Sequence, residues 1–155
     1  DKALAELGNP GVDAIYSAPG QAARETAETA ARAWKLKNRV VDRLRNIDMG
    51  LWQGKLISEI RDRQPKVFRR WQEQPETICP PEGEMLNTAR ERAQTAIERL
   101  LKKHRHGTIG IVVAEPMASL VEELLTHRPA RELWRTDRLV GHCQVINSPH
   151  QSPAT

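Results

Sequence analysis

The sequence has few of the features that define membrane, disulfide-bonded or metal-binding proteins. Its two cysteines, Cys79 and Cys143, lie far apart and lack metal-ligand spacing. We therefore expect reduced thiols, no metal and a cytoplasmic location. No apolar run approaches the roughly 20 residues that cross a bilayer, and no signal-peptide pattern is present. We expect a protein that does not associate with a membrane.

Aromatic residues are also scarce, at 4% of a chain with a net charge of +4 and a pI near 9.4. The run from Lys102 to His106 is the feature best suited to a nucleic-acid backbone. It ends a predicted helix and precedes Gly107, where the helix dipole and the C-cap explain cations. No aromatic-rich strand motif is present to stack bases. A nucleic-acid partner is therefore the least favoured of three functional hypotheses.

The remaining composition fits a folded domain. With 155 residues, 39% of them hydrophobic and 28% charged, the chain can bury one core. We expect a single domain over residues 1–147 and a disordered tail over 148–155. Residues 1–7 resemble the last turns of a helix that Gly8 ends, which suggests that something precedes Asp1 in the native protein.

Apolar, β-forming runs alternate with helical segments. The expected strands are 12–16, 38–44, 108–114 and 139–146. The expected helices are the alanine-rich segment up to Trp34, then 57–64, 65–74, 84–104 and 117–126, with a charged loop or short helix at 131–138. This alternation predicts an α/β fold with a largely parallel sheet. The continuous apolar run 108–114 predicts a central strand buried on both faces, and 38–44 and 139–146 predict edge strands.

The stretch from Val12 to Ala27 carries the first functional signal. A short strand leads through Ser17-Ala18-Pro19-Gly20 into a helix, and free N–H groups at such a helix start can hold an oxyanion. The stretch resembles the second motif of the histidine phosphatase (phosphoglycerate mutase-like) superfamily, Ser-Ser-Pro-Leu-x-Arg-Ala-x-x-Thr-Ala. The matching residues are Ser17, Pro19, Ala23, Thr26 and Ala27. The phosphate-binding arginine of that motif falls on Ala22.

Leu44 to Gly54 resembles a further motif of the family, Leu-x-Glu-x-x-x-Gly-x-Trp-x-Gly. Its acid/base glutamate falls on Asn46, a carboxamide of nearly equal volume that keeps the shape and loses proton transfer. Trp52 by itself is best explained as part of a packed loop.

Pro80 to Glu84 resembles the Pro-x-Gly-Glu-Ser element of the family, with Met85 in place of the serine. Arg92 matches the arginine that usually follows. We favour a structural ion pair or cap between Glu84 and Arg92, and a lid over a ligand is the alternative.

The second catalytic histidine of the family falls on Glu115. By itself Glu115 predicts an acid at a helix N-terminus, where the dipole favours it. In the resembling site, a carboxylate at this position would repel a phosphate.

The resemblance implies a three-layer α/β/α fold, phosphoglycerate mutase-like, with its first strand missing from the chain. The opening segment that carries the phosphorylated histidine and its arginine is absent, and no catalytic residue of the family is intact. We therefore expect a catalytically degenerate domain, without a cofactor, that acts as a binding, scaffolding or regulatory module. The pocket candidates are Ser17, Pro19, Gly20, Gln21, Ala22, Asn46, Glu84 and Glu115.

The alternative is an active phosphomonoesterase or phosphomutase whose phosphohistidine comes from an N-terminal segment outside this chain. His142, His104 or His127 could in principle substitute, but none of the three follows a predicted strand-to-helix turn. The missing strand would also leave a sheet edge unpaired. We expect another chain or segment, or a homo-oligomer, to cover that edge.

Overall fold

The structure, a computed structural model, describes residue 8, residues 11–128 and residues 143–147. Its described residues divide into two compact units. Unit 1 holds the residues up to Asn46 and from Gln94 onward, and unit 2 is Ile47–Ala93. Helix α5 (Leu86–Lys103) passes from unit 2 into unit 1. The expectations for residues 1–7, 131–138 and 148–155 lie outside the described residues.

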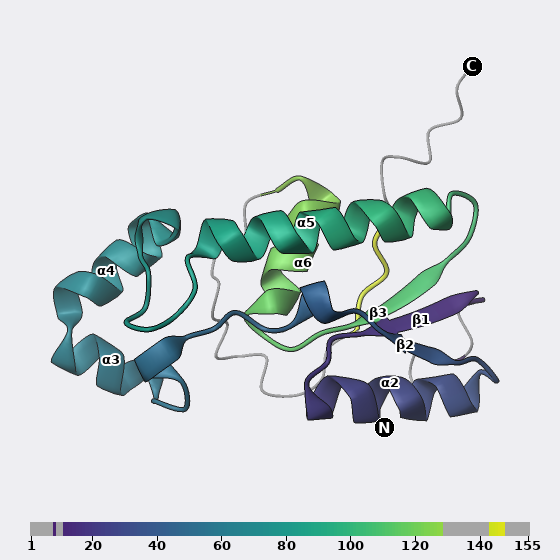
Figure 1. The fold of residues 1–155 in the computed structure, drawn as a ribbon, viewed down its shortest axis with the longest axis horizontal. Coiled ribbons are helices and arrows are strands. Elements are labelled where there is room, and N and C mark those ends of the chain that lie inside the picture. The colour runs from purple at the N-terminus through teal and green to yellow at the C-terminus, as the bar shows by residue number, and fades with distance from the viewer. Residues whose placement is uncertain (1–7, 9–10, 129–142, 148–155) are drawn as a thin grey trace, which may run out of the picture. The chain divides into compact units, whose positions relative to one another are not determined.

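Unit 1 is built on a parallel sheet of three described strands, β1 (Ala14–Ser17), β2 (Asn38–Val40) and β3 (Ile109–Val112). Their order is β2-β1-β3 (Figure 1), with Tyr16 opposite Arg39 on one side and Ile111 on the other. The predicted parallel sheet is confirmed.

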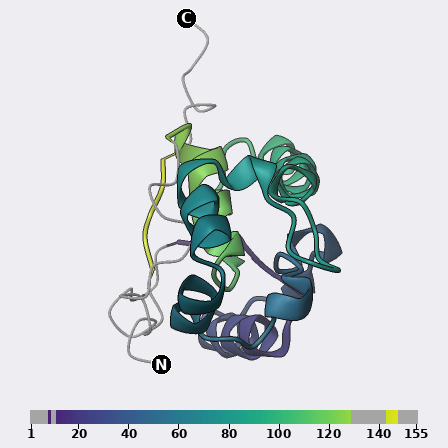
Figure 2. The same ribbon diagram turned by 90° about the vertical axis from the view of Figure 1, so that its left-hand side faces the viewer.

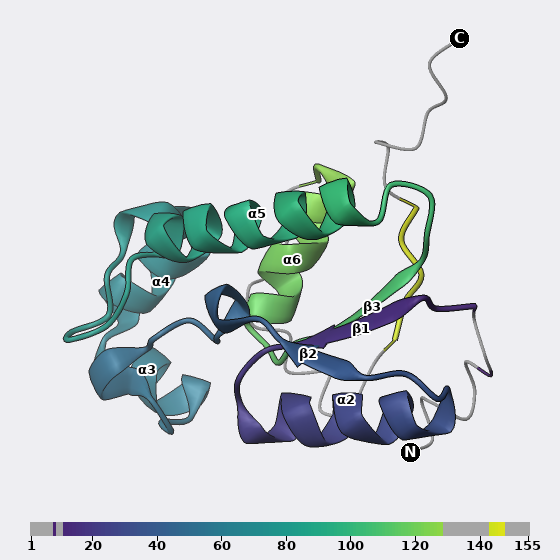
Figure 3. The same ribbon diagram turned by 45° about the vertical axis from the view of Figure 1, so that its right-hand side comes forward.

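Alternate side chains of β1 face two different helices. Ile15 packs against Ala27, Ala30 and Ala31 of α2 (Gln21–Ala33). Ala14 and Tyr16 pack on the opposite face against Leu100 of α5. Methyl-sized side chains let α2 approach the sheet closely, and burial of both faces makes β1 an uninterrupted apolar run. The layers are therefore helix, sheet and helix, as predicted (Figures 2 and 3).

Three strand predictions differ from the structure. β2 ends at Val40, and Asp42–Leu44 forms a 3₁₀ turn that buries Leu44. β3 is half-buried and lies at one end of the described strand order, so the expected burial on both faces is not observed. Within the expected strand 139–146, the described residues 143–146 are not in a strand.

The helix predictions hold within a few residues at each end. The helices beyond α2 and α5 are α3 (Ile57–Arg63), α4 (Pro65–Glu73) and α6 (Met117–Thr126), with 3₁₀ turns at Gly50–Trp52 and Pro75–Thr77. None of the helices in the described part of the chain has the length and apolarity to cross a bilayer.

Two tryptophans form part of the core of unit 2. Trp52 and Trp71 are both buried and meet edge to face, with ring centroids 6.0 Å apart and an interplanar angle of 75°. This confirms that Trp52 belongs to a packed loop. Phe68, three residues before Trp71, is only half-buried.

The loops around Gly50 and Gly83 pack backbone against backbone. Leu51 N–H donates to the Pro81 carbonyl at 2.9 Å, and Glu84 N–H donates to the Asp48 carbonyl at 2.8 Å. A Cβ on Gly50, whose φ is +51°, would fall on the Pro81 carbonyl oxygen, and one on Gly83 would lie 2.7 Å from the Asp48 oxygen. Glycine is required at both positions because no side chain fits between the two loops.

We predict that Gly50→Ala destabilises the chain by about 3 kcal/mol or more, because it adds backbone overlap to the cost of a positive φ. Gly54→Ala is the matched control. Its φ is +75° but nothing lies within 4 Å of the added Cβ, so only the cost of the left-handed backbone, about 1–2 kcal/mol, is expected. Urea unfolding measures both. Equal losses would show that the close approach of the two loops is wrong.

Candidate functional site

The carboxyl ends of β1 and β3 bring two strand-to-helix turns together. Ser17 lies opposite Val112, and Ala18 N–H donates to the Val112 carbonyl at 2.9 Å. The first turn then runs through Pro19 and Gly20 into α2, and the second runs through Glu115 into α6. Ends of parallel strands are where α/β folds place ligands.

Ser17 lies beneath α2. Its side chain is fully buried, and its Oγ accepts a hydrogen bond from Asn38 Nδ2 at 2.9 Å. The bond links β1 to β2 on the α2 face. This placement gives Ser17 a role in holding the sheet.

The start of α2 is exposed and lacks side-chain caps. Gly20 is the N-cap residue, and no side chain of the described residues bonds to the first turn. The Gln21 side chain lies along the helix, and its Nε2 donates to Glu25 Oε1 at 2.8 Å. Ala22 is exposed and offers only a methyl group. This turn retains backbone donors. Its cationic side chain is the exposed Arg24, at the fourth position of the helix.

Asn46 fastens the β3–α6 turn. Its Nδ2 donates to the Glu115 carbonyl at 2.8 Å, and its Oδ1 accepts from Met117 N–H at 3.2 Å. The position follows the 3₁₀ turn that ends at Leu44, whose burial anchors the segment. A carboxamide suits the position because it can donate and accept at the same time.

The Glu115 carboxylate caps α6. Its Oε2 accepts from Ser119 N–H at 3.1 Å and from Ser119 Oγ at 2.8 Å. Ala118 N–H bonds to the Ala114 carbonyl at 3.0 Å, so the first-turn N–H groups of Met117, Ala118 and Ser119 all bond within the chain. The prediction of a helix-terminal acid is confirmed. Sequence reasoning missed Ser119, which the four-residue spacing from Glu115 could have indicated.

Glu84 and Arg92 form a buried ion pair in unit 2. Arg92 Nε and Nη2 each donate to a different Glu84 oxygen at 2.8 Å, and the two side chains are only 11% and 7% exposed. Asp48 N–H also lies 3.4 Å from Glu84 Oε2. The structural ion pair is confirmed. The pocket candidates that unit 1 brings to one edge of its sheet are thus Pro19 to Ala22, Asn46 and Glu115.

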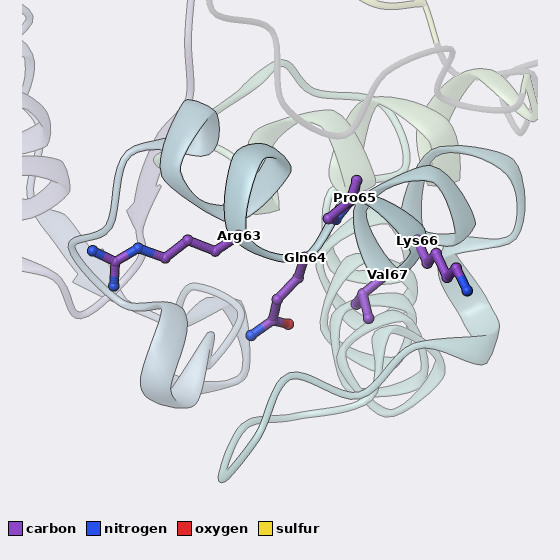
Figure 4. A pocket seen from close by; sticks show the side chains of 5 residues that line it. All are labelled: Arg63, Gln64, Pro65, Lys66 and Val67. Carbon is purple, nitrogen blue, oxygen red and sulfur yellow. The ribbon is translucent and has the colours of Figure 1, made fainter.

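An open hollow of about 390 Å³ lies where α3 meets α4 in unit 2, lined by Arg63, Gln64, Pro65, Lys66 and Val67. The Arg63 and Lys66 side chains point away from each other (Figure 4). Two cations that diverge cannot hold one anion together, so the hollow is a weak candidate for a site.

The histidine, cysteine and acidic side chains of the described residues are the candidates for metal and thiol chemistry. In the described ranges no cluster of three histidine, cysteine or acidic side chains could hold a metal ion. Cys79 and Cys143 are free thiols. Burial raises the pKa of the Cys143 thiol, and a backbone hydrogen bond with Gln144 opposes the increase in that pKa.

The parallel sheet, its two helical layers and the paired turns at the strand ends define a phosphoglycerate mutase-like α/β domain. Residues 1–153 match the histidine phosphatase superfamily (branch 1). The chain belongs to this superfamily.

Known relatives are longer than this chain. It is 35% identical over 107 residues to Phosphoserine phosphatase 1 of Hydrogenobacter thermophilus, a match covering 69% of the chain and 51% of that protein. It is 36% identical over 102 residues to Bifunctional protein Rv2228c of Mycobacterium tuberculosis, which covers 66% of the chain and 28% of that protein. The chain therefore matches about half or less of these relatives' lengths.

Solved structures share the fold. YhfR of Bacillus stearothermophilus aligns with a TM-score of 0.72 at 27% identity, covering 86% of this chain and 66% of that one. The mycobacterial glucosyl-3-phosphoglycerate phosphatase Rv2419c aligns with a TM-score of 0.71 at 22% identity, covering 85% and 66%. The fold prediction is confirmed.

We predict that Glu84→Ala destabilises the chain by about 3–5 kcal/mol, because it leaves the Arg92 charge buried without its partner. The control is Asp62→Ala, which removes the exposed pair between Arg61 and Asp62 and should cost under about 1 kcal/mol. Urea unfolding measures the loss of stability in both variants. A loss for Glu84→Ala no larger than that of the control would contradict a buried pair.

Asn46→Asp tests the clamp on the β3–α6 turn. The new side chain keeps an acceptor for Met117 N–H but puts a carboxylate oxygen against the Glu115 carbonyl. Because Asn46 is exposed, we expect a loss of about 0.5–1.5 kcal/mol at pH 7. Asn87→Asp, an exposed position, should stay within about 0.5 kcal/mol. Thermal unfolding of both variants provides the comparison, and an unchanged Asn46→Asp protein would show that the clamp does not form.

Proposed function

We propose that this chain is a catalytically degenerate histidine phosphatase domain that acts as a binding, scaffolding or regulatory module. One observation carries the proposal. The Glu115 carboxylate lies at the α6 end of the candidate site, and the first-turn N–H groups of that helix bond within the chain. Donors that already have partners are not free to stabilise a transferring phosphoryl group.

The charge balance supports this proposal. A phosphate about 4 Å from Glu115 would be repelled by about 4 kcal/mol per unit charge at an effective dielectric constant near 20. The uncapped start of α2 offers an anion about 0.3–1 kcal/mol. Ala22 adds no positive charge. Arg24 in the first turn of α2 is exposed, and a solvent-exposed cation offsets under about 1 kcal/mol of the repulsion, so repulsion exceeds attraction. A cationic or neutral polar group therefore suits this site better than a phosphate.

Proton transfer is the second function that the site has lost under this proposal. Both polar atoms of Asn46 are engaged with backbone groups of the β3–α6 turn. A carboxamide has no proton to give to a leaving group at neutral pH. Asn46 therefore serves as a structural clamp.

The second candidate function is a phosphomonoesterase or phosphomutase that works with a segment outside this chain. Two observations favour it. The matched relatives include Phosphoserine phosphatase 1, and the first turn of α2 has no side-chain cap. In this case an additional segment supplies the phosphohistidine.

The proposal also includes a partner for the sheet edge and a cellular location for the protein. Within the described ranges no strand pairs with the side of β3 that faces away from β1. An unpaired edge accepts an extended segment readily. We expect a strand from another chain or segment, or a second copy of this chain, to pair there, and we expect a cytoplasmic protein.

Calorimetry with vanadate tests the proposal, because vanadate resembles the phosphoryl-transfer transition state. We predict no micromolar binding to the natural chain and measurable binding to an Ala22→Arg/Glu115→His double variant. The variant removes the repelling charge and adds a donor on each turn. The matched control is Ala33→Arg/Glu28→His, which makes the same charge change at exposed positions of α2 and should not bind.

Micromolar binding to the natural chain would overturn the proposal in favour of the phosphatase. Equal binding by the control would show that net charge alone attracts the anion. If circular dichroism shows that the double variant is folded and it still does not bind vanadate, the residues at positions 22 and 115 do not account for the absence of an anion site.

A further inference from the structure

The amino ends of the strands in unit 1 carry a second feature, at the opposite edge of the sheet from the candidate site. Two connections meet there, residues 34–37 between α2 and β2 and residues 104–108 between α5 and β3 (Figures 1 and 3). They are far apart in the sequence. Parallel pairing of β2 and β3 on either side of β1 puts them at the same edge.

Eight exposed cations lie in these connections and the adjoining ends of α2, β2 and α5. They are Arg32, Lys35, Lys37, Arg39, Arg99, Lys102, Lys103 and Arg105, here called the basic edge. The only acid in residues 11–14, 32–39 and 99–109 is Asp13, so this edge has a net charge of +7. Because the whole chain is only +4, the rest of it has a net charge of −3. Glu28 and Glu98 lie one helical turn before Arg32 and Lys102, and with these two acids included the charge of the edge is +5 and that of the rest is −1. Positive charge is therefore concentrated on one edge of the sheet.

A chain of contacts joins the two halves of the basic edge. Arg39 Nη1 donates to Tyr16 OH at 3.4 Å, and Tyr16 OH and His104 Nε2 share a hydrogen bond of 2.8 Å. Arg39 thereby reaches the end of α5 across β1. Asp13 also bonds inward, where its Oδ2 accepts from Thr108 N–H at 2.8 Å. The edge is one surface, since β1 links both connections.

Ordinary structural roles account for only part of this charge. The negative end of a helix dipole favours Arg32, Lys102 and Lys103, which lie in the last turns of α2 and α5. Lys35, Lys37, Arg39 and Arg105 lie beyond those helices. None of the eight cations has an acidic partner among the described residues. Their mutual repulsion destabilises the fold, which an anionic partner would relieve.

We propose that the basic edge binds the phosphate backbone of duplex nucleic acid without reading its sequence. The starts of β2 and β3, where the two connections end, lie two strand spacings apart, about 10 Å, close to the roughly 12 Å width of a major groove. Lysine and arginine are sufficient for backbone binding. Base recognition in single strands requires stacking aromatic side chains. Among the described residues of this edge, Trp34 packs partly against α2 and its Nε1 donates to the Gly8 carbonyl at 3.0 Å, Tyr16 is buried, and His106 is the exposed ring.

A folded acidic protein fits this edge less well. Protein interfaces are centred on buried aromatic or apolar anchors and are depleted in lysine. The large exposed hydrophobic side chains of the described chain are Val40, Leu51, Leu56, Met85 and Val145, none of which lies in the basic edge. Sequence reasoning gave nucleic acid little weight because the helix dipole and the C-cap explain the run 102–106 and no aromatic-rich strand motif is present. The fold puts residues 35–39 beside that run.

Fluorescence anisotropy with a labelled DNA duplex of about 20 base pairs, between about 50 and 200 mM salt, tests the proposal. The edge variant is Lys37→Gln/Lys102→Gln/Lys103→Gln/Arg105→Gln. The matched control, Arg63→Gln/Lys66→Gln/Arg69→Gln/Arg70→Gln, removes four exposed charges from α3 and α4. We expect the natural chain and the control to bind alike. The edge variant should lose at least about tenfold in affinity and about one unit of salt slope per lost contact.

Further probes distinguish duplex binding from the binding of other anions. Two duplexes of unrelated sequence should bind equally, and single-stranded DNA should bind more weakly. Absence of duplex binding, or equal losses in both variants, would overturn the proposal. Tighter binding of poly-glutamate or of phosphatidylserine vesicles would also overturn it and assign the edge to another partner class. The vanadate experiment tests the candidate site at the opposite edge of the sheet. This proposal and the proposed function can therefore fail separately.

Discussion

The pairing of β1 with both neighbouring strands is the interaction on which unit 1 depends. β1 is buried along its whole length, with α2 on one face and α5 on the other. Because both neighbours are parallel to it, all described strand starts lie at one edge and all strand ends at the other. The candidate site and the basic edge follow from this single arrangement. A change that shifted β1 by one residue would move its side chains between the two helical layers.

The two edges of the sheet also differ in charge. At the strand ends, Glu115 contributes a negative charge, and neither Ala22 nor Asn46 opposes it. At the strand starts, eight cations face Asp13, with Glu28 and Glu98 one helical turn before Arg32 and Lys102. The weak overall charge of the chain therefore conceals a difference between the two edges, and both proposals above rest on that difference.

The sequence predicted the local elements and the family well, and predicted long-range relations less well. Hydrophobic runs, caps and the motif at Ser17 gave the helices, the parallel sheet and the two substituted turns. Burial of β3 was overestimated because an apolar run reports hydrophobicity without showing what covers it. β2 was predicted too long because Leu44 is buried by a 3₁₀ turn, which has no clear sequence signal. The bonds of Asn46 to the β3–α6 turn, formed across about 70 residues, depend on tertiary placement that no local pattern shows.

Under the proposed function, the residues that the motif resemblance puts at the family's catalytic positions have structural roles in this fold. Asn46 supplies a donor and an acceptor to backbone groups that a carboxylate could not satisfy together. The Glu115 carboxylate accepts two hydrogen bonds from Ser119. A histidine at this position has no carboxylate oxygen to accept them. These polar contacts lower the free energy of the fold with groups that a phosphatase would keep available to substrate. This is the pattern expected when the site contributes to stability in place of chemistry, and it is why restoring Arg and His at Ala22 and Glu115 should cost stability while it recovers anion binding.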